Sequence, residues 1–87
     1  MMDRETLRHT LTSMLEENTG EKYSDLNDQV NLRTDLGLDS VDFVQLVIQL
    51  QSEYGIVLET RELENIMLVG DFLNLLEAKL SAKEIAA

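Results

Sequence analysis

The chain has 87 residues and a formal net charge of −10, from 17 acidic and 7 basic side chains. This sign excludes nucleic-acid binding, because a protein that binds phosphates needs a basic surface to displace their counterions. The sequence also lacks cysteine and any apolar run long enough to cross a bilayer, which excludes disulfides, thiolate metal sites and membrane insertion.

The first predicted helix follows Asp3, a favourable N-cap residue, and runs to about Glu17. Its apolar side chains recur at helical spacing and form one stripe, made of Leu7, Leu11, Met14 and Leu15. A long connection over about 21–38 follows, and its apolar side chains keep neither the helix nor the strand period. They are Tyr23, Leu26, Val30, Leu32, Leu36 and Leu38. Such a long connection is unusual in a compact domain, so we expect these side chains to pin it or a function to require it.

The second predicted helix begins at Asp39 or Ser40 and ends near Tyr54, before Gly55. We expect 56–58 to be a buried loop, because a lone strand would have no partner in this chain.

Two further helices complete the pattern. Thr60 is expected to cap a short third helix that reaches Ile66, and a fourth helix is expected from Val69 to Leu80. The fourth would bury Phe72, Leu73, Leu76 and Leu80. The predicted fold is an all-α four-helix bundle over residues 1–80, with a frayed tail over 81–87.

The second helix carries two apolar stripes instead of one. The stripe expected to face the core consists of Phe43, Leu46, Val47, Leu50 and Tyr54. The other consists of Val41, Val44 and Ile48, beside Asp42. A bundle this small has little core left to cover a second stripe, so we expect a partner-binding face. The alternative is that the long connection folds back over it.

The charges near this helix are one-sided. Between residues 34 and 60 there is no Lys or Arg, whereas the acids in that stretch are Asp35, Asp39, Asp42, Glu53 and Glu59. This distribution favours partners with basic surfaces, although acidity can also serve solubility alone. A small domain without disulfides suits the cytoplasm, and we expect a monomer there.

The segment Asp35-Leu36-Gly37-Leu38-Asp39-Ser40-Val41-Asp42 resembles the signature of acyl carrier proteins, in which Leu-Gly-x-Asp-Ser precedes the second helix. The resemblance covers most of the chain, because the helix order, the long connection, the length and the acidity also match. It implies that a phosphopantetheinyl transferase attaches 4′-phosphopantetheine from coenzyme A to Ser40, and that the thiol of this arm carries acyl groups as thioesters.

The local physics of Ser40 is compatible with that role. Free backbone N–H groups and the positive end of a helix dipole stabilise a phosphodiester at a helix start. Gly37 allows a sharp turn before it. Asp39 and Asp42 are expected to hold basic residues or a bound metal on the transferase. The alternative is that Ser40 only caps its helix.

The resemblance further implies a core that can open around the acyl chain. The candidates to line it are Leu46, Val47, Leu50, Tyr54, Ile66, Phe72 and Leu76. Such residues otherwise serve simply as core. Carrier proteins often place a Ser or Thr cap before the fourth helix, where this chain has Met67 and Leu68, so we expect a looser start or a start elsewhere. Gly70 has no explanation at this level.

Departures from the family pattern bear on the pathway. Carriers of bacterial fatty-acid synthesis usually have many Glu residues along the second helix, whereas this chain has Gln45, Gln49, Gln51 and Ser52. Leu38 stands where peptidyl carriers have a second Gly. We therefore expect an acyl load and a specialised lipid or polyketide-type pathway instead of the housekeeping one.

Other functional classes fit less well. A serine hydrolase needs a base beside its nucleophile, and the only histidine, His9, lies on the first helix, so we do not expect an enzyme. No metal site is expected either: an EF-hand starting at Asp35 would have Gly37 at position 3 and Ser40 at position 6, which fails the pattern. The remaining alternative is a helical protein-binding adaptor without a prosthetic group.

Overall fold

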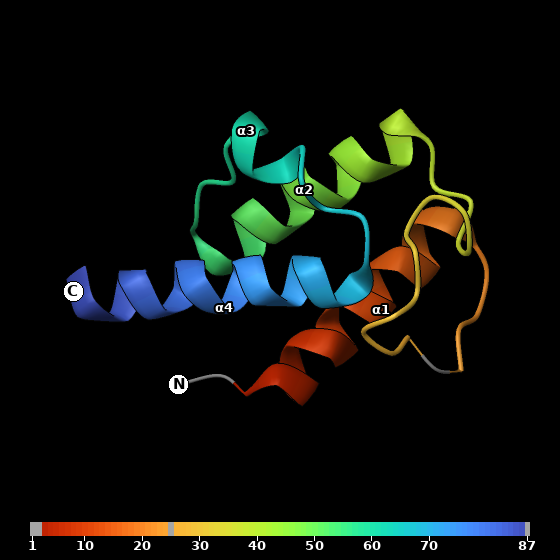
Figure 1. Cartoon of the computed structure of the whole chain (residues 1–87). Coiled ribbons are helices and arrows are strands. Elements are labelled where there is room, and N and C mark those ends of the chain that lie inside the picture. The colour runs from red at the N-terminus through yellow and green to blue at the C-terminus, as the bar shows by residue number, and fades with distance from the viewer. Residues whose placement is uncertain (1–2, 25, 87) are drawn as a thin grey trace.

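The computed structural model describes residues 3–24 and 26–86. Four helices occupy these ranges: α1 (Arg4–Thr19), α2 (Ser40–Tyr54), α3 (Thr60–Leu63) and α4 (Val69–Ala86) (Figure 1). Within the described ranges no strand is present, and Asn31 forms only an isolated bridge with Leu68. The predicted all-α, four-helix fold is confirmed.

Helix α1 is bounded by two specific caps. The Asp3 carboxylate accepts a hydrogen bond from the Thr6 N–H at 2.8 Å. At the other end Gly20 adopts the left-handed conformation, with φ of 78°, and its N–H donates to the Glu16 carbonyl. The helix therefore ends at Thr19, slightly beyond the predicted end. Its buried stripe packs against α2 and α4, and consists of Leu7, Leu11 and Leu15.

The connection between α1 and α2 is attached to the start of α4. Figure 1 shows this loop, orange to yellow, at the same end of the molecule as the first turn of α4. The N–H groups of Val69 and Gly70 donate to the carbonyls of Val30 and Asp28, at 2.9 and 3.1 Å. The loop also places Leu26, Leu32 and Leu38 in the core. Apolar side chains and backbone hydrogen bonds together pin the connection.

This attachment explains Gly70. A Cβ at this position would lie 2.9 Å from the Cβ and 3.0 Å from the carbonyl oxygen of Asp28. The glycine therefore allows the loop backbone to reach the helix.

The expectation of a loose start for α4 is wrong. The Asp71 carboxylate, in the first turn, accepts from the N–H groups of Met67 and Leu68 at 3.1 and 3.0 Å. The loop carbonyls satisfy the next amides. No Ser or Thr is needed, because a first-turn carboxylate also favours the helix dipole.

Two other helix bounds differ from the prediction. Helix α3 ends at Leu63, short of Ile66, and its N-cap is Glu59, not Thr60. The Glu59 N–H donates to the Glu62 carboxylate at 3.1 Å. Helix α4 continues to Ala86, beyond the predicted Leu80, because residues 81–86 contain neither Gly nor Pro and include strong helix formers. Fraying of this tail stays a prediction.

The core faces of α2 and α4 meet in the middle of the molecule. Phe43 and Phe72 form an aromatic pair with ring centroids 5.8 Å apart. After Gly55 the chain buries Ile56 and Leu58 but leaves Val57 exposed. The segment 56–58 is therefore a partly buried loop, which fixes the far end of α2.

Candidate functional site

Ser40 is the first residue of α2 and its side chain is exposed. Asp39 is the N-cap, and its Oδ1 accepts from the Asp42 N–H at 2.8 Å. In return the Asp39 N–H donates to Asp42 Oδ2, at the longer distance of 3.5 Å. This reciprocal pair is a capping box, which holds one carboxylate before Ser40 and another after it.

The first amides of α2 are available to an anion. Within the described ranges, the N–H groups of Ser40 and Val41 have no acceptor. They lie at the positive end of a 15-residue helix dipole. A phosphate ester on the Ser40 Oγ therefore fits this position, because the oxygens of the ester would lie beside unpaired donors.

The turn before Ser40 has a fixed shape. Gly37 adopts a φ of 70°, and its N–H donates to the Arg33 carbonyl at 2.9 Å. An added Cβ would meet nothing within 4 Å, so the glycine is required for its backbone conformation and not for space. Leu38 is buried, and its N–H donates to the Leu32 carbonyl at 3.2 Å. The motif thus anchors Leu38 in the core and leaves the next two side chains, Asp39 and Ser40, exposed.

Asn31 is a structural contributor that the sequence reasoning missed. Its Oδ1 accepts from the N–H groups of Arg33 and Thr34, and its own N–H donates to the Asp35 carboxylate. Asp35 therefore supports the turn. Asn in a connection commonly accepts a hydrogen bond from the backbone N–H two residues on and forms an Asx-turn, so the presence of Asn at this position was the available signal.

The second apolar stripe of α2 is uncovered. Val41 is 67% exposed, and Val44 and Ile48 are each 52% exposed. The loop therefore does not fold back over them, and that alternative is wrong. Asp42 lies half-buried beside the stripe.

The seven predicted pocket residues share one core cluster. Leu46, Leu50, Phe72 and Leu76 are fully buried, Val47 is nearly so, and Tyr54 and Ile66 pack against them from the edge. Within the described ranges, the buried Tyr54 hydroxyl has no hydrogen-bond partner. A buried donor without a partner is costly, which makes this atom the exceptional one in an apolar interior.

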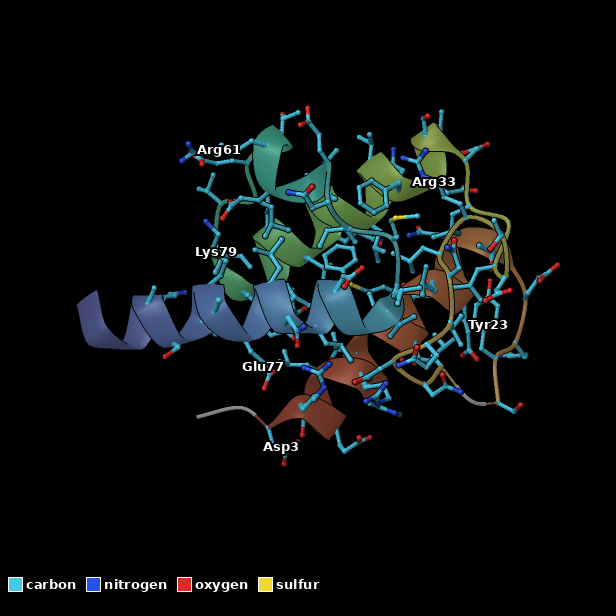
Figure 2. The ribbon with its side chains drawn as sticks, in the orientation of Figure 1. Asp3, Tyr23, Arg33, Arg61, Glu77 and Lys79 are labelled. Carbon is cyan, nitrogen blue, oxygen red and sulfur yellow. The ribbon has the colours of Figure 1, made fainter. Side chains whose placement is uncertain are left out.

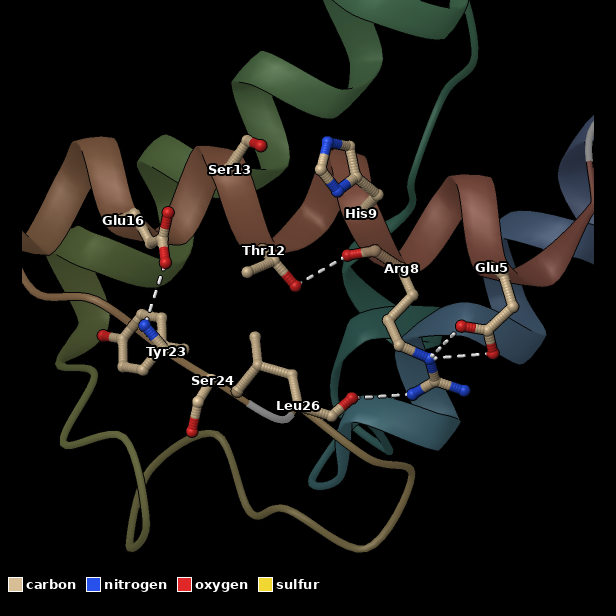
Figure 3. Close-up of a pocket in the computed structure, with 9 residues that line it drawn as sticks. All are labelled: Glu5, Arg8, His9, Thr12, Ser13, Glu16, Tyr23, Ser24 and Leu26. Carbon is tan, nitrogen blue, oxygen red and sulfur yellow. Dashed lines mark hydrogen bonds and ion pairs between the residues drawn. The ribbon is translucent and has the colours of Figure 1, made fainter.

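A hollow of about 470 Å³ lies between α1 and the first part of the loop (Figure 3). Its polar groups already hold the loop in place: Arg8 Nη1 donates to the Leu26 carbonyl at 2.7 Å, and the Tyr23 N–H donates to Glu16 Oε2 at 2.9 Å. We interpret this hollow as structural. His9 lines it and is exposed, as expected for a surface residue.

Most basic side chains are held in ion pairs away from the start of α2. Arg8 and Arg4 donate hydrogen bonds to Asp28, and these bonds lower the pKa of the Asp28 carboxyl below its usual range. Arg4 also pairs with Glu77, and Lys79 pairs with Glu62 at 2.8 Å. In Figure 2, Glu77 and Lys79 lie along α4, whereas Arg33 lies beside the loop that leads to α2.

The carboxylates near Ser40 are free of such pairs. Among the described residues, Asp39 and Asp42 have no basic partner. No group of three His, Asp or Glu side chains suited to a metal ion occurs in the described part of the chain. The helices that the structure describes also include none long and apolar enough to cross a membrane.

Comparison with known proteins decides the family. Residues 9–76 match the model of the phosphopantetheine attachment site family. The acyl carrier protein of Thermotoga maritima is 36% identical over 80 residues, covering 92% of this chain and 99% of the relative. The chain belongs to the acyl carrier protein family.

Other members of the family agree in sequence and in fold. The acyl carrier protein of Saccharopolyspora erythraea is 36% identical over 74 residues, covering 85% of this chain and 78% of that protein. The crystal structure of an acyl carrier protein from Thermotoga maritima superposes with a TM-score of 0.84 at 25% identity, covering 93% and 94% of the two chains. As an acyl carrier protein, this chain is a carrier and not a catalyst, and it carries a covalently attached 4′-phosphopantetheine.

Proposed function

We propose that this acyl carrier protein holds acyl intermediates as thioesters on an arm attached to Ser40, and presents them to the enzymes of a specialised lipid or polyketide-type pathway. The observation that supports the assignment of Ser40 is its exposed side chain at the first position of α2, beside two N–H groups that have no acceptor in the described part of the chain. When bound, the arm supplies the thiol on which the acyl group is carried.

The residues around Ser40 have distinct parts in the attachment. The Ser40 hydroxyl would attack the phosphate of coenzyme A that bears the pantetheine; the Oγ–P bond forms, the pyrophosphate P–O bond breaks, adenosine 3′,5′-bisphosphate leaves, and the hydroxyl proton is released to solvent. The N–H groups of Ser40 and Val41 would then stabilise the phosphodiester. Asp39 and Asp42, which have no basic partner among the described residues, would face basic groups or a bound metal of the phosphopantetheinyl transferase.

Partner enzymes would dock on the exposed stripe of α2. Val41, Val44 and Ile48 provide apolar anchors, and Asp42 provides a flanking charge. The partners are then enzymes with basic surfaces that load, transfer or release acyl groups. We place the protein in the cytoplasm as a monomer.

The acyl chain would enter the core by separating α2 from α3 and α4. The seven residues of the core cluster named above would line the opened space. The Tyr54 hydroxyl, which has no partner among the residues that the structure describes, gives that space a polar group, so the acyl group need not be a plain hydrocarbon.

Intact mass tests the attachment site. The purified protein is incubated with coenzyme A, Mg²⁺ and a broad-range phosphopantetheinyl transferase. We expect the mass of one arm to be gained by the wild type and by Ser52→Ala, which changes another exposed serine of α2, but not by Ser40→Ala. A wild type that stays unmodified would favour the adaptor alternative.

The pathway has its own test. Purified enzymes of housekeeping fatty-acid synthesis are offered this carrier and a housekeeping carrier side by side. We expect slower elongation on this chain, because Gln45, Gln49, Gln51 and Ser52 replace the usual acids of α2. Equal rates would refute the specialised pathway and leave the carrier role intact.

A further inference from the structure

The seam between α1 and α2 contains a groove outside the stripe described above. Two adjoining hollows, of about 520 and 310 Å³, share Met14, Glu17 and Glu53. The other lining residues of the two hollows are His9, Thr10, Ser13, Ile48, Gln49 and Ser52. We call this surface the α1–α2 groove.

The groove has an apolar floor and an acidic rim. Met14 is half-buried against the core and Ile48 is 52% exposed, so both present apolar surface to the hollow. Glu17 and Glu53 are exposed, and in the described part of the chain neither carboxylate has an ion-pair or hydrogen-bond partner. The Lys and Arg side chains that could neutralise them are paired elsewhere or lie outside the lining.

A hydrogen bond joins the two helices beside the groove. Asn18 Nδ2 of α1 donates to Oε1 of Gln49 at 2.9 Å, and Gln49 of α2 lines the larger hollow. The groove is therefore a property of the packed bundle and not of a loop.

Ile48 joins the groove to the proposed docking stripe. It belongs to the series Val41, Val44 and Ile48 and also lines the larger hollow. At 1.5 Å per residue, Ile48 and Glu53 lie about 12 and 20 Å along the helix axis from Ser40. A large partner bound at Ser40 can therefore also reach the groove. A partner that contacts only the surroundings of Ser40 does not reach it.

We propose that the α1–α2 groove is a docking subsite for acyl-loading or acyl-transferring enzymes, occupied by an apolar side chain of the enzyme flanked by Lys or Arg. This inference rests on the proposed carrier function. The apolar side chain would contact Met14 and Ile48, and the basic side chain would pair with Glu17 and Glu53. A second copy of this chain is a poor occupant, because its own charge of −10 repels the acidic rim.

A peptide probe tests the chemistry of the groove. A synthetic amphipathic helix with a leucine stripe flanked by lysines is titrated into isotope-labelled carrier and followed by NMR. We expect saturable shifts at the Met14 and Ile48 methyl groups. The double variant Glu17→Lys/Glu53→Lys should weaken the affinity about tenfold or more. The control Glu21→Lys/Glu64→Lys makes the same change in net charge at exposed sites outside the groove and should change the affinity less than twofold.

Enzyme kinetics tests the partner. The enzyme is a purified synthetase that loads a fatty acid onto the arm-bearing carrier. The groove variant should raise the KM for the carrier while kcat stays within twofold. The control variant should leave the KM unchanged. Three results would each overturn the proposal. The groove variant and the control variant could have equal effects, or the peptide could shift the Val41 and Val44 signals without shifting Met14. Sedimentation could also show a dimer of the carrier that the groove variant abolishes. Mass gain at Ser40 is measured on every variant: a wild type that gains no arm counts against the proposed function, whereas a modified carrier without groove effects counts against this inference alone.

Discussion

At the scale of single residues, Asp39 and Gly70 have well-defined local roles. Asp39 has two roles that chemistry can separate, because its carboxylate caps α2 and also carries a charge next to Ser40. Gly70 has one role, which is to leave room for the backbone of Asp28. Each role predicts how particular substitutions at these two positions will change stability or arm transfer.

Replacing Asp39 should separate capping from charge. Asp39→Ala removes the acceptor for the Asp42 N–H and should cost about 1 kcal/mol of stability. Asp39→Asn keeps a good cap and should leave stability nearly unchanged, since Asn caps as well as Asp. Both variants should slow modification by the transferase. The measurements are urea unfolding and the rate of arm transfer; normal transfer in Asp39→Asn would show that the charge is not used.

Gly70→Ala should destabilise the protein although alanine is the better helix former. The added methyl group would lie 2.9 Å from the Asp28 Cβ, and overpacking of this kind typically costs about 1–3 kcal/mol. The higher helix propensity of alanine stabilises the helix by about 1 kcal/mol at most, which does not offset this cost. Ala78→Gly, at an exposed site of the same helix, serves as the control for helix preference and should cost about 1 kcal/mol. A more stable Gly70→Ala in urea unfolding would contradict the tight approach of the loop.

At the scale of elements, α2 divides its apolar residues between the core and the surface. Its bounds and both stripes could be predicted, because Gly37, Asp39 and Gly55 mark its ends and the spacing marks its faces. The start of α4 at Val69 was predicted, but its firm hold was not, although the Asp71 carboxylate in its first turn was a signal. The end of α3 and the bonds from the loop carbonyls to the Val69 and Gly70 amides could not be predicted, because backbone hydrogen bonds leave no pattern in the side chains.

The two faces of α2 should respond differently to the same change. Val47→Ala removes buried volume and should cost about 1–2 kcal/mol, whereas Val44→Ala, at an exposed site, should cost less than about 0.5 kcal/mol. Val44→Ala should instead raise the KM of partner enzymes several-fold. Thermal unfolding and partner kinetics on both variants check this, and equal stability losses would mean that the stripe is covered.

At the scale of the whole molecule, ion pairs tie distant parts of the chain together. Arg4 and Arg8 of α1 hold Asp28 of the loop, and Arg4 also contacts Gly70 and Glu77 of α4. The position of Ser40 at the exposed start of α2 was predictable from the short motif around it, whereas its role as the attachment site stays a prediction. These ion pairs were not predictable, because charged residues 20 or more positions apart carry no local signal.

The stabilising effect of Asp28 should depend on pH. Arg8 and Arg4 lower its pKa in the folded state, so its contribution is fully present above the ordinary pKa of about 4 and is lost as the pH falls below that value. The difference in unfolding free energy between wild type and Asp28→Asn should therefore be largest near pH 7 and shrink toward pH 3. Protonation of the many other carboxylates at low pH reduces charge repulsion in both proteins, so this effect largely cancels in the difference. A difference that is constant with pH would show that the ion pairs contribute little.

The backbone contacts of Leu32 have a mechanical consequence for the tether point. Its N–H donates to the Met67 carbonyl and its carbonyl accepts from the Leu38 N–H, so only two hydrogen bonds separate the segment before α4 from the turn before Ser40. On the carrier role proposed above, we expect a displacement of that segment, such as an expansion of the core around an acyl chain, to reach the turn before Ser40 through these two bonds. Amide exchange at residues 32 and 38 would accordingly report, from outside the core, whether the carrier is loaded.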